Sequence, residues 1–138
     1  MNITAEDFLK KIGEDEKLIR QKQKERAFWE ELAYSATANV ESVRVKSSSD
    51  GTALQKKAIE IIMIDQEIQA LKSDIIYRVG VMSKLNVSEY VLLHEAYVQH
   101  VPYIDIAKKA HRSYSSVMKL RRCALDNLQT IINSNYYT

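Results

Sequence analysis

The stretch Tyr103–Leu128, YIDIAKKAHRSYSSVMKLRRCALDNL, decides the fold because it divides into a short helix, a tight turn and a second helix. Ile106 and Ala107 give the first helix a small apolar pair. The turn is expected at 110–112. Ser113 is a favourable N-cap for the second helix, since its hydroxyl can accept a hydrogen bond from a backbone N–H of the first turn. This order of features predicts a helix-turn-helix.

The second helix sorts its side chains onto two opposite stripes, at about 100° per residue. The stripe predicted to pack against the rest of the protein is apolar and consists of Val117, Leu120, Ala124, Leu128 and Ile131. The opposite stripe, predicted to face a ligand, consists of Ser115, Met118, Lys119 and Arg122. Cys123, the only cysteine, lies beside the apolar stripe and is expected to be a small buried residue.

Positive charge is concentrated in the same stretch, although the whole chain has a net charge of only +2. Between Asp105 and Asp126 there is no acidic residue and there are six Lys or Arg. A run of charge is often only a solvated helix face, but within a helix-turn-helix it favours binding to DNA phosphates. The outward stripe of the second helix is expected to read base edges. The residues expected to contact phosphate are Lys108, Lys109, Arg112, Ser113, Tyr114 and Arg121.

A heptad repeat precedes this region and predicts coiled-coil packing. The seam recurs every seven residues and consists of Leu54, Ile61, Ile68, Ile75 and Met82. Its partner is expected to be either a preceding helix, from Thr4 to about Ser35, folded back antiparallel, or a second copy of the chain. A mobile loop is expected at 36–51, before a capping box formed by Thr52 and Gln55.

These features predict an all-α protein in two parts. Residues 1–86 are expected to form a long antiparallel helical hairpin, coiled-coil-like, with its loop at 36–51. Residues 87–138 are expected to form the helix-turn-helix domain, beginning with a helix at about 88–99. The composition agrees, because 3 Gly and 1 Pro in 138 residues are few enough for a mostly helical chain.

Catalytic, metal-binding and membrane functions find no motif in the sequence. There is no glycine-rich phosphate loop, no His-Glu-x-x-His and no nucleophile elbow, so no catalytic residue and no cofactor are expected. The three histidines, His94, His100 and His111, do not have the spacing of metal ligands. No run approaches the roughly 18 apolar residues that span a bilayer, and a cytoplasmic protein is expected.

The region from about Ser88 to Leu128 resembles region 4 of bacterial sigma factors, at Tyr97, Ile106-Ala107, Ser113, Val117 and Ala124-Leu125. With a long helical hairpin in front, the chain resembles the sigma-region-4-like regulators of the ArpU and RinA kind, from phages and prophages of Gram-positive bacteria. The resemblance implies a DNA-binding regulator, an activator of phage late genes acting with the host RNA polymerase. The chain departs from the pattern at the turn, where His111 and Arg112 replace the usual glycine and apolar residue.

Two other functions remain open from the sequence. The helix-turn-helix region can instead be a docking module for RNA polymerase or another protein, with little DNA contact. A small terminase-like packaging component also joins a helix-turn-helix to an oligomerising helical part, but its reading head is usually N-terminal, whereas here it is C-terminal. A homodimer through the long helices is compatible with DNA binding and with docking, whereas a packaging component is expected to form a large ring.

Overall fold

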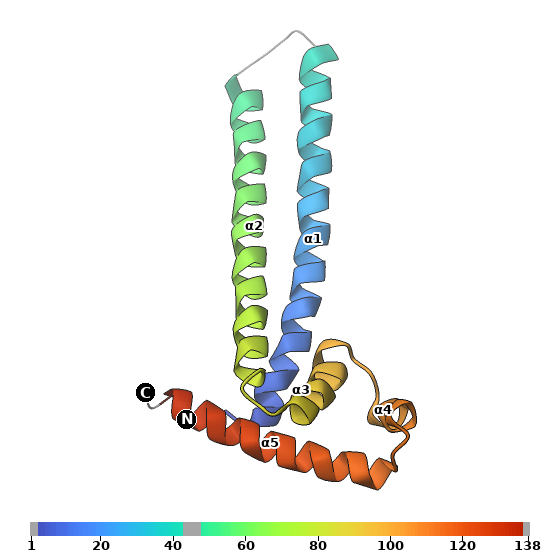
Figure 1. The fold of residues 1–138 in the computed structure, drawn as a ribbon. Helices are drawn as coiled ribbons and strands as arrows, with labels where there is room; N and C mark the ends of the chain where they lie inside the picture. The colour runs from blue at the N-terminus through green and yellow to red at the C-terminus, as the bar shows by residue number, and fades with distance from the viewer. Residues whose placement is uncertain (1–2, 43–47, 137–138) are drawn as a thin grey trace. The chain divides into compact units, whose positions relative to one another are not determined.

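The computed structural model describes residues 3–42 and 48–136, with side chains for 3–34 and 53–134, and within these residues it consists of helices joined by short turns. In chain order the elements are α1 (Ala5–Ser42), α2 (Ser48–Met82), α3 (Val87–Leu93), the π-helical turn η1 (His94–Val98), α4 (Tyr103–Ala110) and α5 (Tyr114–Tyr136) (Figure 1). The all-α prediction is therefore confirmed, and α3 with η1 corresponds to the helix expected at 88–99.

Helices occupy most of the segment 36–51, in which a loop was expected. Helix α1 continues to Ser42 and α2 already begins at Ser48, so Thr52 lies inside α2 and the predicted capping box does not start a helix. Only 43–47 of the expected loop falls outside the described residues. Residues 36–42 contain neither glycine nor proline, so no helix-breaking residue ends α1 in this part of the expected loop.

The chain divides into two compact units. One unit contains residues 1–15 and 74–138, and the other contains residues 16–73. The first turns of α1 and the last turns of α2 therefore belong with the helix-turn-helix. We call these the helix-turn-helix unit and the hairpin unit.

The hairpin unit consists of the long antiparallel parts of α1 and α2, which lie side by side (Figure 1). In the predicted seam, Ile68 is buried, as is Ile64 one turn earlier, and Leu54 and Ile61 are half-buried. Ion pairs from Arg26 to Asp65 and from Lys22 to Glu67 cross between the helices. This arrangement is compatible with the predicted coiled coil, with α1 of the same chain as the partner.

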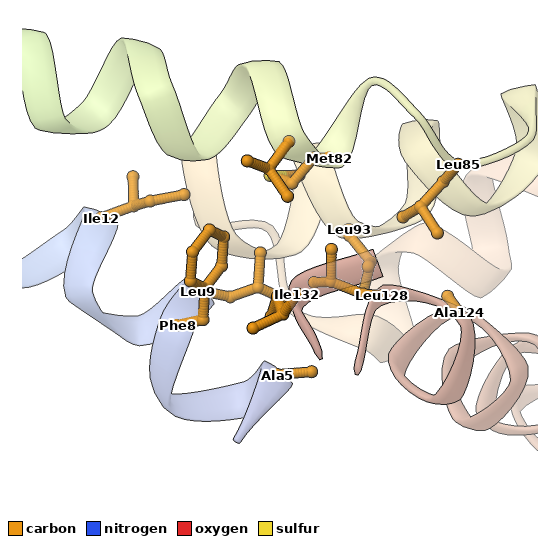
Figure 2. Close-up of a cluster of buried hydrophobic side chains, with 11 residues drawn as sticks. Ala5, Phe8, Leu9, Ile12, Met82, Leu85, Leu93, Ala124, Leu128 and Ile132 are labelled. Carbon is orange, nitrogen blue, oxygen red and sulfur yellow. The ribbon is translucent and has the colours of Figure 1, made fainter. Parts of the chain in front are cut away.

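The core of the helix-turn-helix unit brings together four helices that are far apart in sequence (Figure 2). The last two seam residues belong here: Met82 is fully buried in this core and Ile75 packs against it. The buried residues come from α1 (Ala5, Phe8, Leu9, Ile12), α2 and the turn after it (Val81, Met82, Leu85), α3 (Leu93) and α5 (Ala124, Leu128, Ile132). The helix-turn-helix is therefore built on the N-terminal residues of the chain.

The N-terminus of α1 is fixed by hydrogen bonds. The Thr4 hydroxyl accepts a hydrogen bond from the Asp7 backbone N–H at 3.1 Å, so Thr4 is the N-cap of α1. The Gln129 side chain of α5 accepts from the Ala5 N–H at 2.7 Å and donates to the Ile3 carbonyl at 3.0 Å. The Gln129 amide thus satisfies one N–H that the start of α1 leaves without an intrahelical partner, and also binds the carbonyl of the residue before the N-cap.

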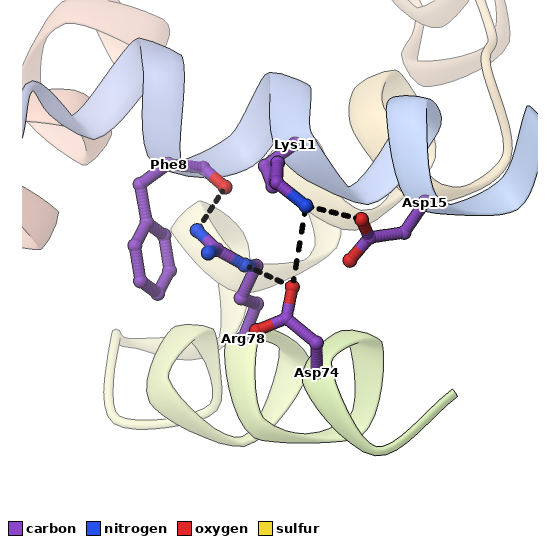
Figure 3. A network of polar contacts seen from close by, with 5 residues as sticks. All are labelled: Phe8, Lys11, Asp15, Asp74 and Arg78. Atoms are coloured by element: carbon purple, nitrogen blue, oxygen red, sulfur yellow. Dashed lines mark hydrogen bonds and ion pairs between the residues drawn. The ribbon is translucent and has the colours of Figure 1, made fainter. Parts of the chain in front are cut away.

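A polar network lies beside this core, between the first turns of α1 and the last turns of α2 (Figure 3). Lys11 makes ion pairs with Asp15 and Asp74, and its Nζ lies 4.0 Å from Oδ2 of Asp74. Arg78 donates to Asp74 at 2.9 Å and to the Phe8 carbonyl at 3.1 Å, and its guanidinium stacks over the Phe8 ring at 4.7 Å. Arg78 of α2 is therefore held by contacts with α1 as well as with Asp74.

Gly13 marks a close approach between α1 and the segment after η1. A methyl group at this position would lie 3.3 Å from Cε1 of His100, and His100 itself has a positive φ of 59°. A glycine inside a helix costs about 1 kcal/mol relative to alanine. Here its missing side chain makes room for the imidazole of His100.

Candidate nucleic-acid interface

The turn between α4 and α5 is closed by a left-handed residue. His111 has φ 57° and ψ 42°, the conformation expected at the position where glycine is usual. Its backbone N–H donates to the Lys108 carbonyl at 3.2 Å, and the Arg112 N–H donates to the Ala107 carbonyl at 3.0 Å. This pair of bonds is a Schellman motif, which satisfies the last carbonyls of α4 and reverses the chain direction.

Helix α5 begins where the sequence predicts. The Ser113 hydroxyl accepts a hydrogen bond from the Ser116 backbone N–H at 3.1 Å, so Ser113 is the N-cap and Tyr114 the first helical residue. Because the Schellman turn and the cap are consecutive, the first turn of α5 has a defined position relative to α4.

A small apolar cluster sets the rotation of α5 about its own axis. Leu92 of α3, Ile106 and Ala107 of α4 and Val117 of α5 are all buried together. Leu120 packs against this cluster. Since Val117 faces inward, the residues on the other side of α5 face outward, as the two-stripe pattern predicts.

The outward residues form what we call the reading face of α5. Ser115, Lys119 and Arg122 are exposed, whereas Met118 is only partly exposed. Cys123 is also exposed, so the expectation of a buried cysteine is wrong. Its position next to Arg122 puts it on the outward side of the helix, one step beyond the packed stripe.

The other residues expected to contact phosphate lie at the end of α4, in the turn and at the start of α5. The exposed residues of this group are Lys108, Lys109, Arg112, Ser113 and Tyr114. Lys109 makes an ion pair with Glu95 at 3.0 Å, although its side chain stays 68% exposed. Among the described residues, no carboxylate pairs with Lys108, Arg112, Lys119 or Arg122, so their charges are available to an anionic ligand.

Arg121 does not belong to this surface, in contrast to the sequence-based expectation. Its guanidinium donates to the Tyr103 hydroxyl at 3.1 Å, pairs with Glu6 at 3.2 Å and lies 5.4 Å from the centre of the Tyr103 ring. Burial raises the pKa of Tyr103, and Arg121 opposes that shift. Arg121 is thus a structural residue that connects α5 to α4 and α1, and no local sequence signal reveals its partner Glu6.

A second feature missed by sequence analysis is an apolar cleft of about 460 Å³ between α3, α4 and α5. Leu92, Ile106 and Val117 line it, and Lys109 and Arg112 stand at its edge. Val91 is 47% exposed there. Helix α3 has only seven residues, which is too short a pattern to predict such a cleft.

Other kinds of site do not emerge from the described residues. No group of three or more His, Cys, Asp or Glu in residues 3–42 and 48–136 is arranged to hold a metal ion. No helix in that part of the chain has the length and apolar character to cross a membrane.

Comparisons with known proteins find no relative of this chain. No family model, no curated protein and no solved structure matches it.

Proposed function

We propose that this protein binds double-stranded DNA through the reading face of α5 and regulates transcription. The observation that carries the proposal is the rigid α4–turn–α5 geometry. The Schellman turn at His111, the Ser113 cap and the burial of Val117 leave Ser115, Lys119 and Arg122 exposed on one side of α5. This is the geometry that recognition helices use in the major groove.

The roles of the residues follow from their position and chemistry. Ser115 and Lys119 lie in the first turns of α5, where recognition helices meet base edges, and a lysine can donate to O6 and N7 of guanine. Arg122 is long enough to reach either a base or the backbone, and Met118 offers an apolar contact. Lys108, Lys109, Arg112, Ser113 and Tyr114 are positioned for phosphate contacts.

The resemblance to sigma region 4 supports a more specific form of the proposal. In this form the protein is an activator of phage late genes that acts with the host RNA polymerase. The apolar cleft with its basic edge supports the alternative in which the same unit docks on a protein and touches DNA little.

Binding isotherms test the DNA proposal directly. Sequences bound by the protein are first selected from a random duplex pool, and affinities for the selected and an unrelated duplex are then measured by fluorescence anisotropy at several salt concentrations. Lys119→Ala should cost about 1–3 kcal/mol on the selected duplex and little on the unrelated one. Lys108→Ala should weaken both duplexes alike and reduce the salt slope by about one unit.

Lys24→Ala is the matched control, because it removes one exposed lysine from the hairpin unit and should change neither affinity. Equal losses on both duplexes for Lys119→Ala would show that α5 does not read sequence. If neither Lys119→Ala nor Lys108→Ala changes DNA binding, the protein-docking function is favoured. A large ring in light scattering would favour the packaging function.

A further inference from the structure

The outer face of α2 in the hairpin unit carries an uncharged stripe. We call it the back stripe, and it consists of Ile59, Ile62, Met63, Gln66, Gln69, Ala70 and Ser73. All seven residues are exposed, and they recur at intervals of three and four residues. They lie on the side of α2 opposite its inward-facing residues Ile61, Ile64 and Ile68. Ile59, Ile62 and Met63 are 54%, 55% and 47% exposed.

The other helix of the same hairpin provides a comparison. The exposed side of α1 carries Lys17, Arg20, Lys24 and Glu31, and the exposed Phe28 lies among these charged residues. The absence of charge on the back stripe is therefore particular to α2. Three large apolar side chains exposed together at one end of an uncharged stripe form a surface that a partner can cover.

We propose that a second copy of this chain covers the back stripe, with the two α2 helices antiparallel and Gln66 on the two-fold axis. The stripe is asymmetric in size about Gln66, with Ile59, Ile62 and Met63 on one side and Gln69, Ala70 and Ser73 on the other. In the antiparallel pair Ile59 faces Ser73, Ile62 faces Ala70 and Met63 faces Gln69, because these positions are equally far from Gln66.

This pairing places a large side chain against a small one at both ends of the interface, which is how facing helices interdigitate. In a parallel pair each residue would face its own copy. Isoleucine would then lie against isoleucine at one end, and at the other end Ala70 would face Ala70 and Ser73 would face Ser73 across a gap. A two-fold interface is self-complementary by symmetry, so one stripe is sufficient for both partners.

The polar groups at the centre of the stripe suit the same arrangement. The Gln66 amide has both a donor and an acceptor, so two copies on the axis can bond to each other and fix the register. The acids on either side of Gln66 are already paired within the chain, Asp65 with Arg26 and Glu67 with Lys22. Two copies can approach without bringing unpaired carboxylates together.

The area of the stripe is that of a weak interface. From Ile59 to Ser73 the stripe runs along roughly 21 Å of helix. The three large side chains expose on the order of 300 Å² per copy, and the whole contact would bury on the order of 1,000 Å², the lower limit for a specific interface. The proposed dimer is therefore weak, with a dissociation constant in the micromolar range.

Sedimentation velocity on the full chain, from about 1 μM to about 500 μM, tests the dimer. The wild-type protein should pass from monomer to dimer over this range. Ile62→Glu should raise the dissociation constant by at least about tenfold. Leu18→Glu is the matched control, because it introduces the same charge at a residue of α1 that is 41% exposed, and it should dimerise like the wild type.

A wild-type protein that stays monomeric at all concentrations, or a dimer that Ile62→Glu leaves intact, would overturn the proposal. Circular dichroism melts of both glutamate variants show that they remain folded.

Cysteine cross-linking tests the orientation, in a background where the exposed Cys123 is replaced by serine. A mixture of Ile59→Cys and Ser73→Cys chains should form a disulfide between the two variants, whereas neither variant should link to itself. Gln66→Cys should link to itself. Self-linking of Ile59→Cys without the mixed product would show a parallel pair and overturn the antiparallel arrangement.

Discussion

Replacement of Leu9 by alanine tests whether the start of the chain is part of the helix-turn-helix core. Leu9 lies in α1, is fully buried, and belongs to the same cluster as Met82, Leu93 and Leu128 (Figure 2). A fully buried leucine that is shortened to alanine loses its transfer free energy and leaves a cavity, which costs about 3 kcal/mol. Against a total stability of about 5–15 kcal/mol, this is a large fraction.

The expected loss corresponds to a decrease of about 10 °C in the melting temperature for a chain of this size. Far-UV circular dichroism during thermal and urea denaturation measures it. Leu18→Ala, at a residue of the same helix that is 41% exposed, is the control and should cost less than about 1 kcal/mol. If Leu9→Ala and Leu18→Ala melt together, the N-terminal turns do not support the core and the division into units is wrong.

Three further substitutions test the turn, the seam and the polar network by urea denaturation. His111→Gly should raise the free energy of unfolding by about 1 kcal/mol, because glycine adopts the left-handed conformation without a steric cost; a clear decrease would show that the imidazole has a stabilising contact. Ile68→Asp should cost several kcal/mol by burying an unpaired carboxylate, and a wild-type melt would remove the seam as a source of stability. Asp15→Asn should stabilise the protein at neutral pH, because burial and the neighbouring Asp74 hold the pKa of Asp15 above its ordinary value of 3.8 and the folded state disfavours the ionised form. This gain should vanish as the pH falls below 3.8, where Asp15 is protonated in both states, and a gain that persists in acid would contradict the assignment.

The features that the sequence predicted correctly depend on neighbouring residues. The left-handed turn at His111 and the cap at Ser113 follow from a few consecutive positions, and the burial of Val117 follows from the period of one helix. The seam around Ile68 was also predictable, because a heptad repeat sustained from Leu54 to Met82 leaves one face of α2 apolar whatever covers it.

The features that sequence analysis missed depend on contacts between distant segments. Arg121 seemed available for phosphate because its partner Glu6 is more than a hundred residues away along the chain. A similar sequence separation hid the role of Phe8 and Leu9, which pack with residues of α2, α3 and α5. The apolar cleft arises where α3, α4 and α5 meet, and three short patterns do not specify their mutual packing.

Helix α5 combines features set by neighbouring residues with contacts to distant segments, because its two ends have different surroundings. Its first turns present Ser115 and Lys119 to solvent, while its later turns bury Leu128 and bond the start of α1 through Gln129. Arg121 lies between them and is fixed by Tyr103 and Glu6. A recognition helix must hold its contacts within fractions of an ångström, and rigid support from neighbouring elements provides this. The N-terminal residues therefore serve the proposed reading face by fixing the helix that carries it, although none of them is proposed to touch DNA.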